Sequence, residues 1–505
     1  MKKAVLAVVA GAAVVAAALV PSGPPVAAAM SGFGSAVSAV GKVTWQTNDS
    51  VNALAVAGDT VYAGGLFTRI RQPGKVEGQG EAARTYLAAF DRTTGTPTVF
   101  APKLNGAVWS IASSLDGKWV VVGGDFTTVD GVARQHIAMF SVATGKLVAG
   151  WDPAVSYRVA ALAIQGTSVY LGGSFQRVDK AVRNRVAAVA LSTGALLPWD
   201  PDADNDVYAL KSSDDGTRIF VGGGFSELNG DHHWALAMVN PTTGAVFDMP
   251  AADAIPEPSP DCMSRVRDID TADGRVFVAN AGSGIGCYDG VLAADETTGK
   301  LLWQSQCLGA TEAIKVIGNW LYKGSHAHDC SKDGGFPDKT GMHHLLVESV
   351  INGKLGPWYP NTDAGGETLV GPLAFASGGN DLWVGGDFTT VNGKPQQGLT
   401  RFDNAPGGAK PAVPAAPKVA STRANQSSVS FTTVVDADNI ALSYVLYRGT
   451  TKVASWSRSS YSWTQPTVQT FTDTAVRSGQ TVSYHVEVGD GRNLSKSAAV
   501  AVKIR

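Results

Sequence analysis

Five residues that could bind a transition metal lie close together in the sequence, around one predicted loop. They are two histidines and an aspartate, followed by two adjacent histidines on the far side of the loop: His326, His328, Asp329, His343 and His344. Imidazole and carboxylate groups together suit zinc, and a His-x-His spacing places two ligands on one side of an extended segment. The alternative is a polar loop whose histidines bond to backbone groups. We treat these five residues as candidates for ligand binding and leave zinc binding open.

Four aspartates that alternate with other residues form a second candidate metal site. They follow Trp199 and are Asp200, Asp202, Asp204 and Asp206. The alternation resembles the start of a calcium loop of the EF-hand type, but Asn205 stands where that loop has glycine, and Lys211 stands where it needs a bidentate glutamate. A calcium site of another kind stays open, and a solvated acidic turn is the favoured interpretation.

Three arginines recur at one position, three residues before a predicted strand: Arg84, Arg134 and Arg183. Such residues could surround the entrance of a ligand site. Their repetition favours a structural role, in which each pairs with a carboxylate of a neighbouring unit.

Seven copies of one sequence pattern between Val51 and Asp403 must position these residues. Each copy predicts four short antiparallel strands separated by glycine or polar turns, at a spacing of about fifty residues, which is typical of a β-propeller. In the first copy the strands are expected at residues 51–56, 61–64, 87–91 and 98–100. The seventh copy lacks its fourth strand, and residues 41–45 resemble that missing strand. We therefore expect residues 40–403 to form a seven-bladed β-propeller that the N-terminal strand closes.

Two further features of the repeat are interpreted as structural. One aromatic residue per unit should pack between neighbouring blades: Trp45, Phe100, Trp151, Trp199, Phe247, Trp303 and Trp358. Paired glycines should stand where inner strands converge and a side chain would crowd them: 64/65, 123/124, 172/173, 222/223 and 385/386.

All four cysteines, Cys262, Cys287, Cys307 and Cys330, fall in the fifth and sixth repeats. An even number of cysteines in an exported chain indicates disulfides, and the sequence alone allows three pairings. Equivalent positions in the repeat favour Cys262 with Cys287 and Cys307 with Cys330. Each bond would contribute about 3 kcal/mol by the loop-entropy account. Because these two repeats also lose the Gly-Gly-x-Phe phrase, we expect them to form a specialised sector.

The two ends of the chain differ from the repeats. Residues 1–29 combine two lysines, an apolar run and an Ala-Ala-Ala box, which predicts a secretory signal peptide. Residues 404–416 are rich in proline, alanine and glycine and predict a linker. Residues 417–505 predict a small β-sandwich in which Val482, Tyr484, Val486 and Val488 line the inner face.

The Gly-Gly-x-Phe and Thr-Gly phrases, the segment Gly-Ser-His-Ala-His-Asp-Cys at 324–330 and the run from Leu382 to Gly393 resemble a family of secreted bacterial β-propeller proteins. The resemblance covers about residues 43 to 403, and the region from about Pro417 is similar to a fibronectin type III domain, with Phe431 at the place of its early-strand tryptophan. It implies export and an all-β fold: a propeller followed by a fibronectin type III-like sandwich. It implies no catalytic residues.

A net charge of -2 and the absence of a basic run exclude the electrostatic pattern of a nucleic-acid-binding protein. We expect a secreted, monomeric, non-catalytic protein that presents one face of the ring to an extracellular polysaccharide or a cell-surface protein, with no membrane attachment after signal cleavage. The competing hypothesis is an extracellular glycosidase or polysaccharide lyase whose site lies in repeats five and six. No cofactor is firmly predicted; Ca²⁺ and Zn²⁺ stay open.

Overall fold

The structure of the chain is a computed structural model, and it describes residues 37–284, 286–337, 341–365, 370–403 and 408–505. Within these residues the regular structure is β-strand, apart from two short 3-10 helices, η2 (Pro250–Ala254) and η3 (Ser331–Asp333). The all-β class is confirmed. The predicted signal peptide lies outside the described residues. No helix in the described part of the chain is long and apolar enough to cross a membrane.

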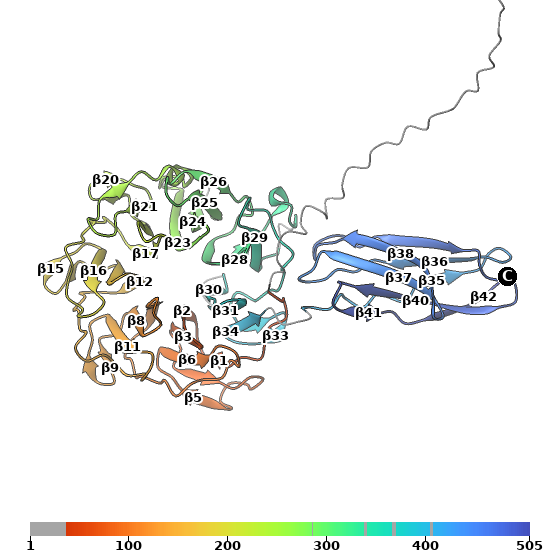
Figure 1. The fold of residues 1–505 in the computed structure, drawn as a ribbon, viewed down its shortest axis with the longest axis horizontal. Coiled ribbons are helices and arrows are strands. Elements are labelled where there is room, and N and C mark those ends of the chain that lie inside the picture. The colour runs from red at the N-terminus through yellow and green to blue at the C-terminus, as the bar shows by residue number, and fades with distance from the viewer. Residues whose placement is uncertain (1–36, 285, 338–340, 366–369, 404–407) are drawn as a thin grey trace, which may run out of the picture. The chain divides into compact units, whose positions relative to one another are not determined.

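Seven antiparallel sheets follow one another along the chain, each built from three or four strands in sequence order (Figure 1). Here they are numbered sheets 1 to 7. Their first strands are β2 (Val51–Ala57), β7 (Val108–Ser113), β12 (Val159–Gln165), β17 (Val207–Ser212), β23 (Cys262–Ala272), β27 (Thr311–Ile317) and β30 (Pro372–Ala376). Their second strands are β3 (Thr60–Gly65), β8 (Trp119–Gly124), β13 (Ser168–Gly173), β18 (Ile219–Gly223), β24 (Arg275–Gly284), β28 (Trp320–Ala327) and β31 (Asp381–Gly386). Their third strands are β6 (Leu87–Asp91), β11 (Ile137–Ser141), β16 (Val186–Ala190), β21 (Leu236–Val239), β25 (Val291–Asp295), β29 (His343–Ser349) and β34 (Leu399–Asp403).

The first strands contact one another in cyclic order. Each first strand contacts the first strand of the next sheet, and β30 of sheet 7 contacts β2 of sheet 1. The seven sheets therefore form a ring whose first strands face the centre (Figure 1).

The paired glycines stand where the sheets converge, as expected. A Cβ on Gly64 would lie 2.2 Å from Cγ1 of Val108 in the next sheet, and one on Gly65 would lie 2.0 Å from the carbonyl oxygen of Ser50. The contact repeats across the junction of sheets 7 and 1, where a Cβ on Gly385 would lie 2.5 Å from Cγ1 of Val51. A side chain at the first glycine would separate adjoining sheets, and one at the second would clash with the backbone that leads into the first strand of its own sheet.

The fourth strand differs from the expectation. Within the described ranges it is a regular strand only in sheets 4 and 5, as β22 (Val246–Phe247) and β26 (Leu301–Gln304). In sheet 1 a single bridge, Phe90 to Pro97, replaces the strand expected at 98–100. Sheets 2, 3 and 6 have the same single bridge with leucine at the position of Pro97: Phe140 to Leu147, Val189 to Leu196 and Glu348 to Leu355.

The N-terminal segment lies against sheet 7 as predicted, but not as a regular strand. Ser38 N donates to Asp403 O at 2.9 Å, and Lys42 N donates to Arg401 O at 2.9 Å. The first strand assigned there, β1 (Gln46–Thr47), pairs instead with β4 (Arg69–Arg71) of a hairpin in unit 1. The segment thus joins the two ends of the ring through backbone bonds.

The loop between the second and third strands carries a hairpin that the sequence analysis did not anticipate. It occurs in units 1, 2, 3, 4 and 7, whose sheets have the Gly-Gly-x-Phe phrase. The strand pairs are β4 with β5 (Glu81–Ala83), β9 (Thr128–Val129) with β10 (Val132–Ala133), β14 (Arg177–Val178) with β15 (Ala181–Val182), β19 (Glu227–Leu228) with β20 (Asp231–His232), and β32 (Thr390–Val391) with β33 (Lys394–Pro395). The phrase therefore marks a local structural unit that is not found among the described residues of units 5 and 6.

The outer aromatic residues pack between sheets, which supports their structural interpretation. The indole Nε1 of Trp151 donates to Ala190 O of sheet 3 at 3.1 Å, and Trp199 Nε1 donates to Asn240 O of unit 4 at 2.9 Å. Both tryptophans are almost completely buried.

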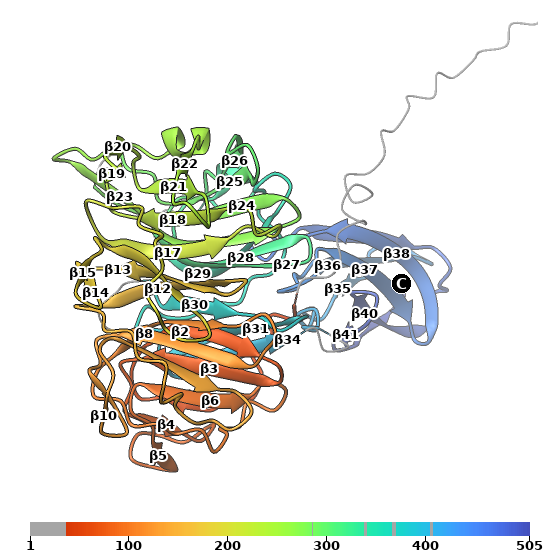
Figure 2. The ribbon, with the colours of Figure 1, turned by 60° about the vertical axis from the view of Figure 1, so that its left-hand side comes forward.

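The C-terminal strands form two sheets of their own (Figures 1 and 2). One contains β35 (Lys418–Ala420), β36 (Ser427–Thr432) and β39 (Val468–Asp473). The other contains β37 (Ala441–Arg448), β38 (Thr451–Ser459), β40 (Thr481–Gly489), β41 (Leu494–Lys496) and β42 (Val500–Lys503). Side chains of both sheets share one core, which contains Phe431, Tyr484, Val486 and Val488, with Val482 partly buried beside it. The predicted inner face is therefore correct.

Replacing Gly124 by alanine should destabilise the ring by about 1–3 kcal/mol, because the new Cβ would lie 2.1 Å from the Ala107 carbonyl oxygen, a backbone atom that cannot rotate away. Urea unfolding followed by tryptophan fluorescence measures the change. Gly150→Ala is the control, since a Cβ there meets nothing within 4 Å. Equal effects of the two substitutions would contradict the packing role of the glycine.

Candidate functional site

Every first strand contains a β-bulge at the same place. The register with the second strand shifts by one residue between Val51 and Ala53 in sheet 1, and at the equivalent point in each other sheet. A bulge leaves one residue outside the ladder and redirects its side chain. The seven bulge residues are Asn52, Trp109, Ala160, Tyr208, Arg267, Glu312 and Leu373.

The bulge residues line one cavity. All seven are half-buried, whereas the residue before each of them is buried. Together with Arg158, Ser174 and Asp206 they enclose about 360 Å³. Because the first strands face the centre of the ring, this central cavity has one wall residue from each sheet. Its composition, two aromatic rings among planar polar side chains, is that of a binding site for a polar ligand.

On one side of the central cavity, three side chains hold one another in place. Trp109 Nε1 donates to Asp125 Oδ2 at 2.7 Å. Arg158 donates to both oxygens of the same carboxylate, at 2.7 and 2.8 Å, and its guanidinium lies 4.4 Å from the centre of the Trp109 ring. A bidentate pair of this kind fixes the guanidinium plane. The indole is therefore a rigid surface, and the charge of Arg158 is neutralised.

A second ion pair lies across sheets 5 and 6. Arg267 Nε donates to Glu312 Oε2 at 2.6 Å, and the guanidinium lies 4.9 Å from the centre of the Tyr208 ring. Both members of the pair are bulge residues, so their contact joins two walls of the central cavity. Their remaining donors and acceptors are available to hydroxyl groups of a ligand.

Deeper in the ring, the wall formed by sheets 4 to 6 is charged. Asp268 lines a further cavity of about 160 Å³ together with Arg267 and Glu312. Burial raises the pKa of Asp268 to about 7, although the Ile314 N–H donates to its carboxylate at 2.9 Å. Beyond it, Lys211 and Lys315 donate to Asp270 at 2.7 and 2.8 Å.

Burial alone would raise the pKa of Asp270, but the two ammonium groups outweigh it and hold that pKa below its usual range. The sheets outside this sector have small residues at the positions of Asp268 and Asp270: Ala53, Ala55, Ser110, Ala112, Ala161, Ala163, Ala374 and Ala376. The charged groups are thus confined to one side of the ring.

A larger cavity of about 600 Å³ extends from the Arg267–Glu312 pair over sheets 5 and 6. Its wall includes Arg265, Met263 and His326. Strand β23 is longer than the other first strands, and the disulfide Cys262–Cys287 joins the end of the β23–β24 hairpin to the following loop. The expected specialisation of this sector is therefore visible in the length of its strands and in its cavity.

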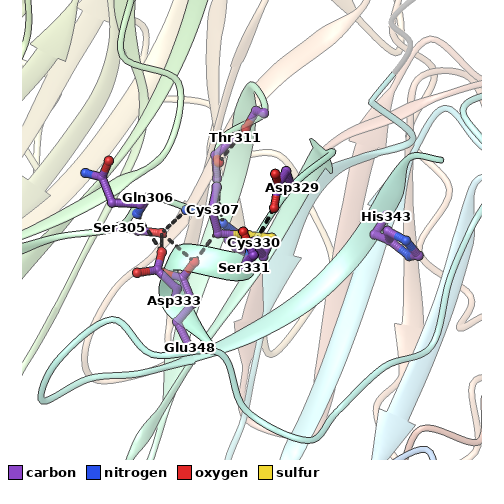
Figure 3. Close-up of a disulfide and its surroundings, with 12 residues drawn as sticks. Ser305, Gln306, Cys307, Thr311, Asp329, Cys330, Ser331, Asp333, His343 and Glu348 are labelled. Atoms are coloured by element: carbon purple, nitrogen blue, oxygen red, sulfur yellow. Dashed lines mark hydrogen bonds and ion pairs between the residues drawn. A yellow bond between two sulfur atoms is a disulfide. The ribbon is translucent and has the colours of Figure 1, made fainter. Parts of the chain in front are cut away.

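The second disulfide, Cys307–Cys330, is also the pairing that the repeat positions favour (Figure 3). Beside it, Ser305 Oγ lies 3.0 Å from Asp333 Oδ2 and 2.9 Å from Glu348 Oε1, so two carboxyl groups share its single hydroxyl proton. Glu348 pairs with Lys323 at 2.7 Å, and neither side chain is exposed. Because Lys323 Nζ also donates to Cys307 O at 3.0 Å, the buried pair holds the loop that leads to Glu312.

The five histidine and aspartate candidates separate into different environments. His326 lines the larger cavity, its Nε2 accepts from Ala310 N at 3.4 Å, and burial lowers its pKa. The His328 ring lies 5.3 Å from the His326 ring. Asp329 Oδ1 accepts from Ser331 N at 3.0 Å, and His344 Nδ1 donates to Thr362 O at 2.7 Å. His343 packs 4.0 Å from Phe336 between ring centres, well away from Asp329 in Figure 3.

The four aspartates after Trp199 have separate structural partners. Asp200 pairs with Arg183 at 3.1 Å and Asp206 with Arg185 at 3.6 Å. The backbone N of Asp202 donates to Asn229 Oδ1 at 3.1 Å. Asp204 Oδ1 accepts from two consecutive backbone N–H groups, those of Ser226 and Glu227. Asn48, Asn105, Ser156 and Asp363 accept equivalent pairs of bonds in other units. These contacts favour the structural interpretation.

In the described part of the chain, no three His, Cys, Asp or Glu side chains are grouped as metal ligands. The recurring arginines lie away from the central cavity. Arg84 donates to Thr98 O at 3.2 Å, and Arg134 donates to Ala149 O at 2.9 Å. The carboxylate partners of Arg134 and Arg183 are Asp152 and Asp200, which belong to their own units rather than to neighbouring ones as expected. These contacts support a structural role for the recurring arginines, but with carboxylate partners from the same unit and not from a neighbouring one.

The sequence analysis missed the bulge residues, although the repeats contain a signal for them. The phrase that opens each unit is nearly constant except at its second position, as in Val51-Asn-Ala-Leu54, Val108-Trp-Ser-Ile111, Val207-Tyr-Ala-Leu210 and Val266-Arg-Asp-Ile269. Variation at one position between constant neighbours indicates a residue freed from packing.

No protein-family model matches the chain, and no curated protein matches it in sequence. The family resemblance stays a prediction.

The wild-type protein should lose stability as the pH rises from about 4 to about 7, and replacing Asp268 by asparagine should remove that loss. The pKa of this carboxyl is about 7 in the folded chain against an ordinary 3.8, so the folded state binds more protons in that window and wild-type stability falls as pH rises. The asparagine variant is neutral throughout and lacks this contribution. Urea unfolding at pH 5 and pH 8 measures the difference, with the exposed Asp231→Asn as control. An unchanged slope would contradict the raised pKa.

Proposed function

We propose that the ring is a seven-bladed β-propeller of a secreted protein, that a fibronectin type III-like domain follows it, and that the central cavity binds an extracellular glycan without cleaving it. The cyclic contacts of the first strands support the propeller, as does the glycine packing at the junctions other than that between sheets 5 and 6, where Ala279 stands at the glycine position. Two disulfides support an oxidising compartment, because such bonds persist mainly in exported proteins.

The observation that carries the glycan proposal is the ring of bulge residues. Trp109 and Tyr208 present aromatic rings, and Asn52, Arg267 and Glu312 present planar hydrogen-bonding groups around the same cavity. Sugar rings need both kinds of group, since their C–H faces pack on aromatic rings while their hydroxyls exchange hydrogen bonds. Because Arg158 and Arg267 are each paired with a carboxylate, the central cavity does not demand a highly charged ligand.

Trp109→Ala should weaken binding by about tenfold or more, because it removes the fixed aromatic surface, and tenfold corresponds to about 1.4 kcal/mol. The measurement is co-sedimentation of purified residues 30–505 with insoluble polysaccharides and cell-wall preparations, with and without chelator. Leu115→Ala is the control, since that side chain is 87% exposed. We expect retention on at least one glycan.

If wild type and Trp109→Ala are retained equally, the binding site lies outside the central cavity. Retention on no glycan would contradict the proposal and favour a protein ligand. Loss of retention with chelator would add a metal ion to the site, and His326→Ala and His328→Ala would then show whether those histidines hold it.

A carbohydrate-active enzyme is the second candidate, and one observation favours it. Asp268, with a pKa of about 7, lines the same cavity as the carboxyl group of Glu312, and glycoside cleavage uses a pair of carboxyl groups, one of them an acid with a raised pKa. If the protein is a hydrolase or lyase, prolonged incubation with the retained glycan should release shorter products, and Asp268→Asn should abolish that release while binding persists. If the incubation releases no shorter products, the non-catalytic proposal is favoured.

A further inference from the structure

The residues around the central cavity include one cation whose carboxylate partner is missing. The residue two positions before the bulge residue differs between units, and in two units it is an arginine: Arg158 in sheet 3 and Arg265 in sheet 5. Arg158 is neutralised by Asp125 of sheet 2, which is the third residue of a Gly-Gly-x-Phe phrase. The equivalent third residue in sheet 4, beside Arg265, is Gly224.

The surroundings of Gly224 match those of Asp125. Asp125 touches the bulge residue of its own sheet, Trp109, and the arginine of the next sheet. A Cβ on Gly224 would lie 3.7 Å from Cε2 of Tyr208, the bulge residue of its own sheet, and 3.7 Å from Cγ of Arg265 in the next sheet. Sheets 4 and 5 thus place an aromatic bulge residue and an arginine of the next sheet beside Gly224, as sheets 2 and 3 do beside Asp125, although the Tyr208 ring is faced by Arg267 and not by Arg265.

The space beside Arg265 is open to a ligand. A Cβ on Gly224 would come no closer to any neighbouring atom than ordinary van der Waals contact. Arg265 is half-buried and lines the cavity of about 600 Å³, which shares Arg267 and Glu312 with the central cavity. Across the described residues the structure shows no ion pair for its guanidinium, whereas Arg267 is occupied by Glu312. A partly desolvated guanidinium without a carboxylate favours an anion that supplies one.

We propose that Arg265 is an anion subsite, and that the glycan bound in the central cavity carries a carboxylate, as a uronic acid does, which takes the place that Asp125 occupies beside Arg158. This inference rests on the proposed glycan binding and assigns its substrate class. The neutral part of the ligand contacts the bulge residues, and its carboxylate lies between Tyr208 and Arg265. Gly224 is then a specificity residue, because its lack of a side chain leaves the anion site vacant for the ligand.

The test compares acidic glycans with neutral forms of the same chain. The probes are an oligogalacturonate of six sugars with its methyl ester, and a hyaluronan hexasaccharide with its carboxyl-reduced form, titrated by calorimetry. Wild type should bind an acidic member at least about tenfold more tightly than its neutral partner, the size of one charge-assisted hydrogen-bonded pair. Arg265→Met and Gly224→Asp should both remove the preference, the first by removing the cation and the second by supplying the missing carboxylate.

Two control variants separate charge from shape. Gly224→Asn has nearly the shape of Gly224→Asp without its charge and should retain much of the preference, and the exposed Arg177→Met should retain all of it. Equal affinity of wild type for both members of a pair, or binding confined to neutral glycans of the panel, would overturn this inference and leave the proposed function standing. A preference that survives in Arg265→Met would also overturn it.

A stability measurement tests the subsite without a ligand. In a double-mutant cycle, Gly224→Asp should be more favourable to folding in the wild-type background than in the Arg265→Met background, and the difference should shrink in high salt. Absence of this coupling would overturn the assigned geometry. If no glycan binds, the proposed function fails, and the coupling alone then decides whether an anion subsite exists beside Arg265.

Discussion

The contact between a glycine of one sheet and the opening residue of the next sheet's first strand is the constraint on which the ring depends. Gly64 against Val108, Gly172 against Val207 and Gly385 against Val51 are the same contact at three junctions. Without a side chain on the glycine, adjoining first strands approach closely and converge on the centre. The next residue of each first strand is the bulge residue, which stands outside the ladder and lines the cavity. The close contact between sheets and the lining of the site are therefore neighbouring positions of one strand.

The sector formed by sheets 5 and 6 departs from this plan by introducing polar groups into the protein interior. At the position of Lys323 the other sheets have apolar residues such as Val122 and Val221, and at the position of Glu348 they have residues such as Phe90 and Phe140. Burying an ion pair costs desolvation energy that apolar residues avoid. Here the pair also bonds to Ser305 and to the carbonyl of Cys307. The sector thus holds a loop in place at some expense in packing, which is typical of a functional region.

Electrostatics gives the central cavity two different sides. Beside Trp109 every charge has a partner, so that side is rigid and neutral. Beside Tyr208, Gly224 stands in place of the aspartate, and Arg265 keeps its charge. The unequal sides give a ligand one orientation, since a neutral portion suits the first and an anionic group suits the second. Internal repetition of the chain makes this comparison possible, because each sheet serves as the reference for the others.

The sequence alone determined the all-β class and the seven-fold repetition, because these follow from local composition and from the period of the repeat. The repeat positions also predicted the role of the glycine pairs and favoured, among three possible pairings, the two disulfides that the structure contains. The sequence also placed a specialised sector in repeats five and six. It did not reveal the working side chains. Histidines and aspartates were prominent because their chemistry is recognisable residue by residue, yet Asp204 and His344 bond to backbone groups.

Tertiary structure decided the site, because it collects one residue from each of seven sheets that are far apart in the chain. Only a register shift, which depends on pairing with the second strand, turns Trp109 or Glu312 toward the centre. Only the packing of sheet 4 against sheet 5 brings Arg265 beside Gly224, and only the contrast with Arg158 and Asp125 shows what is missing there. The repeat specified how each sheet is built, whereas convergence at the centre specified which side chains meet.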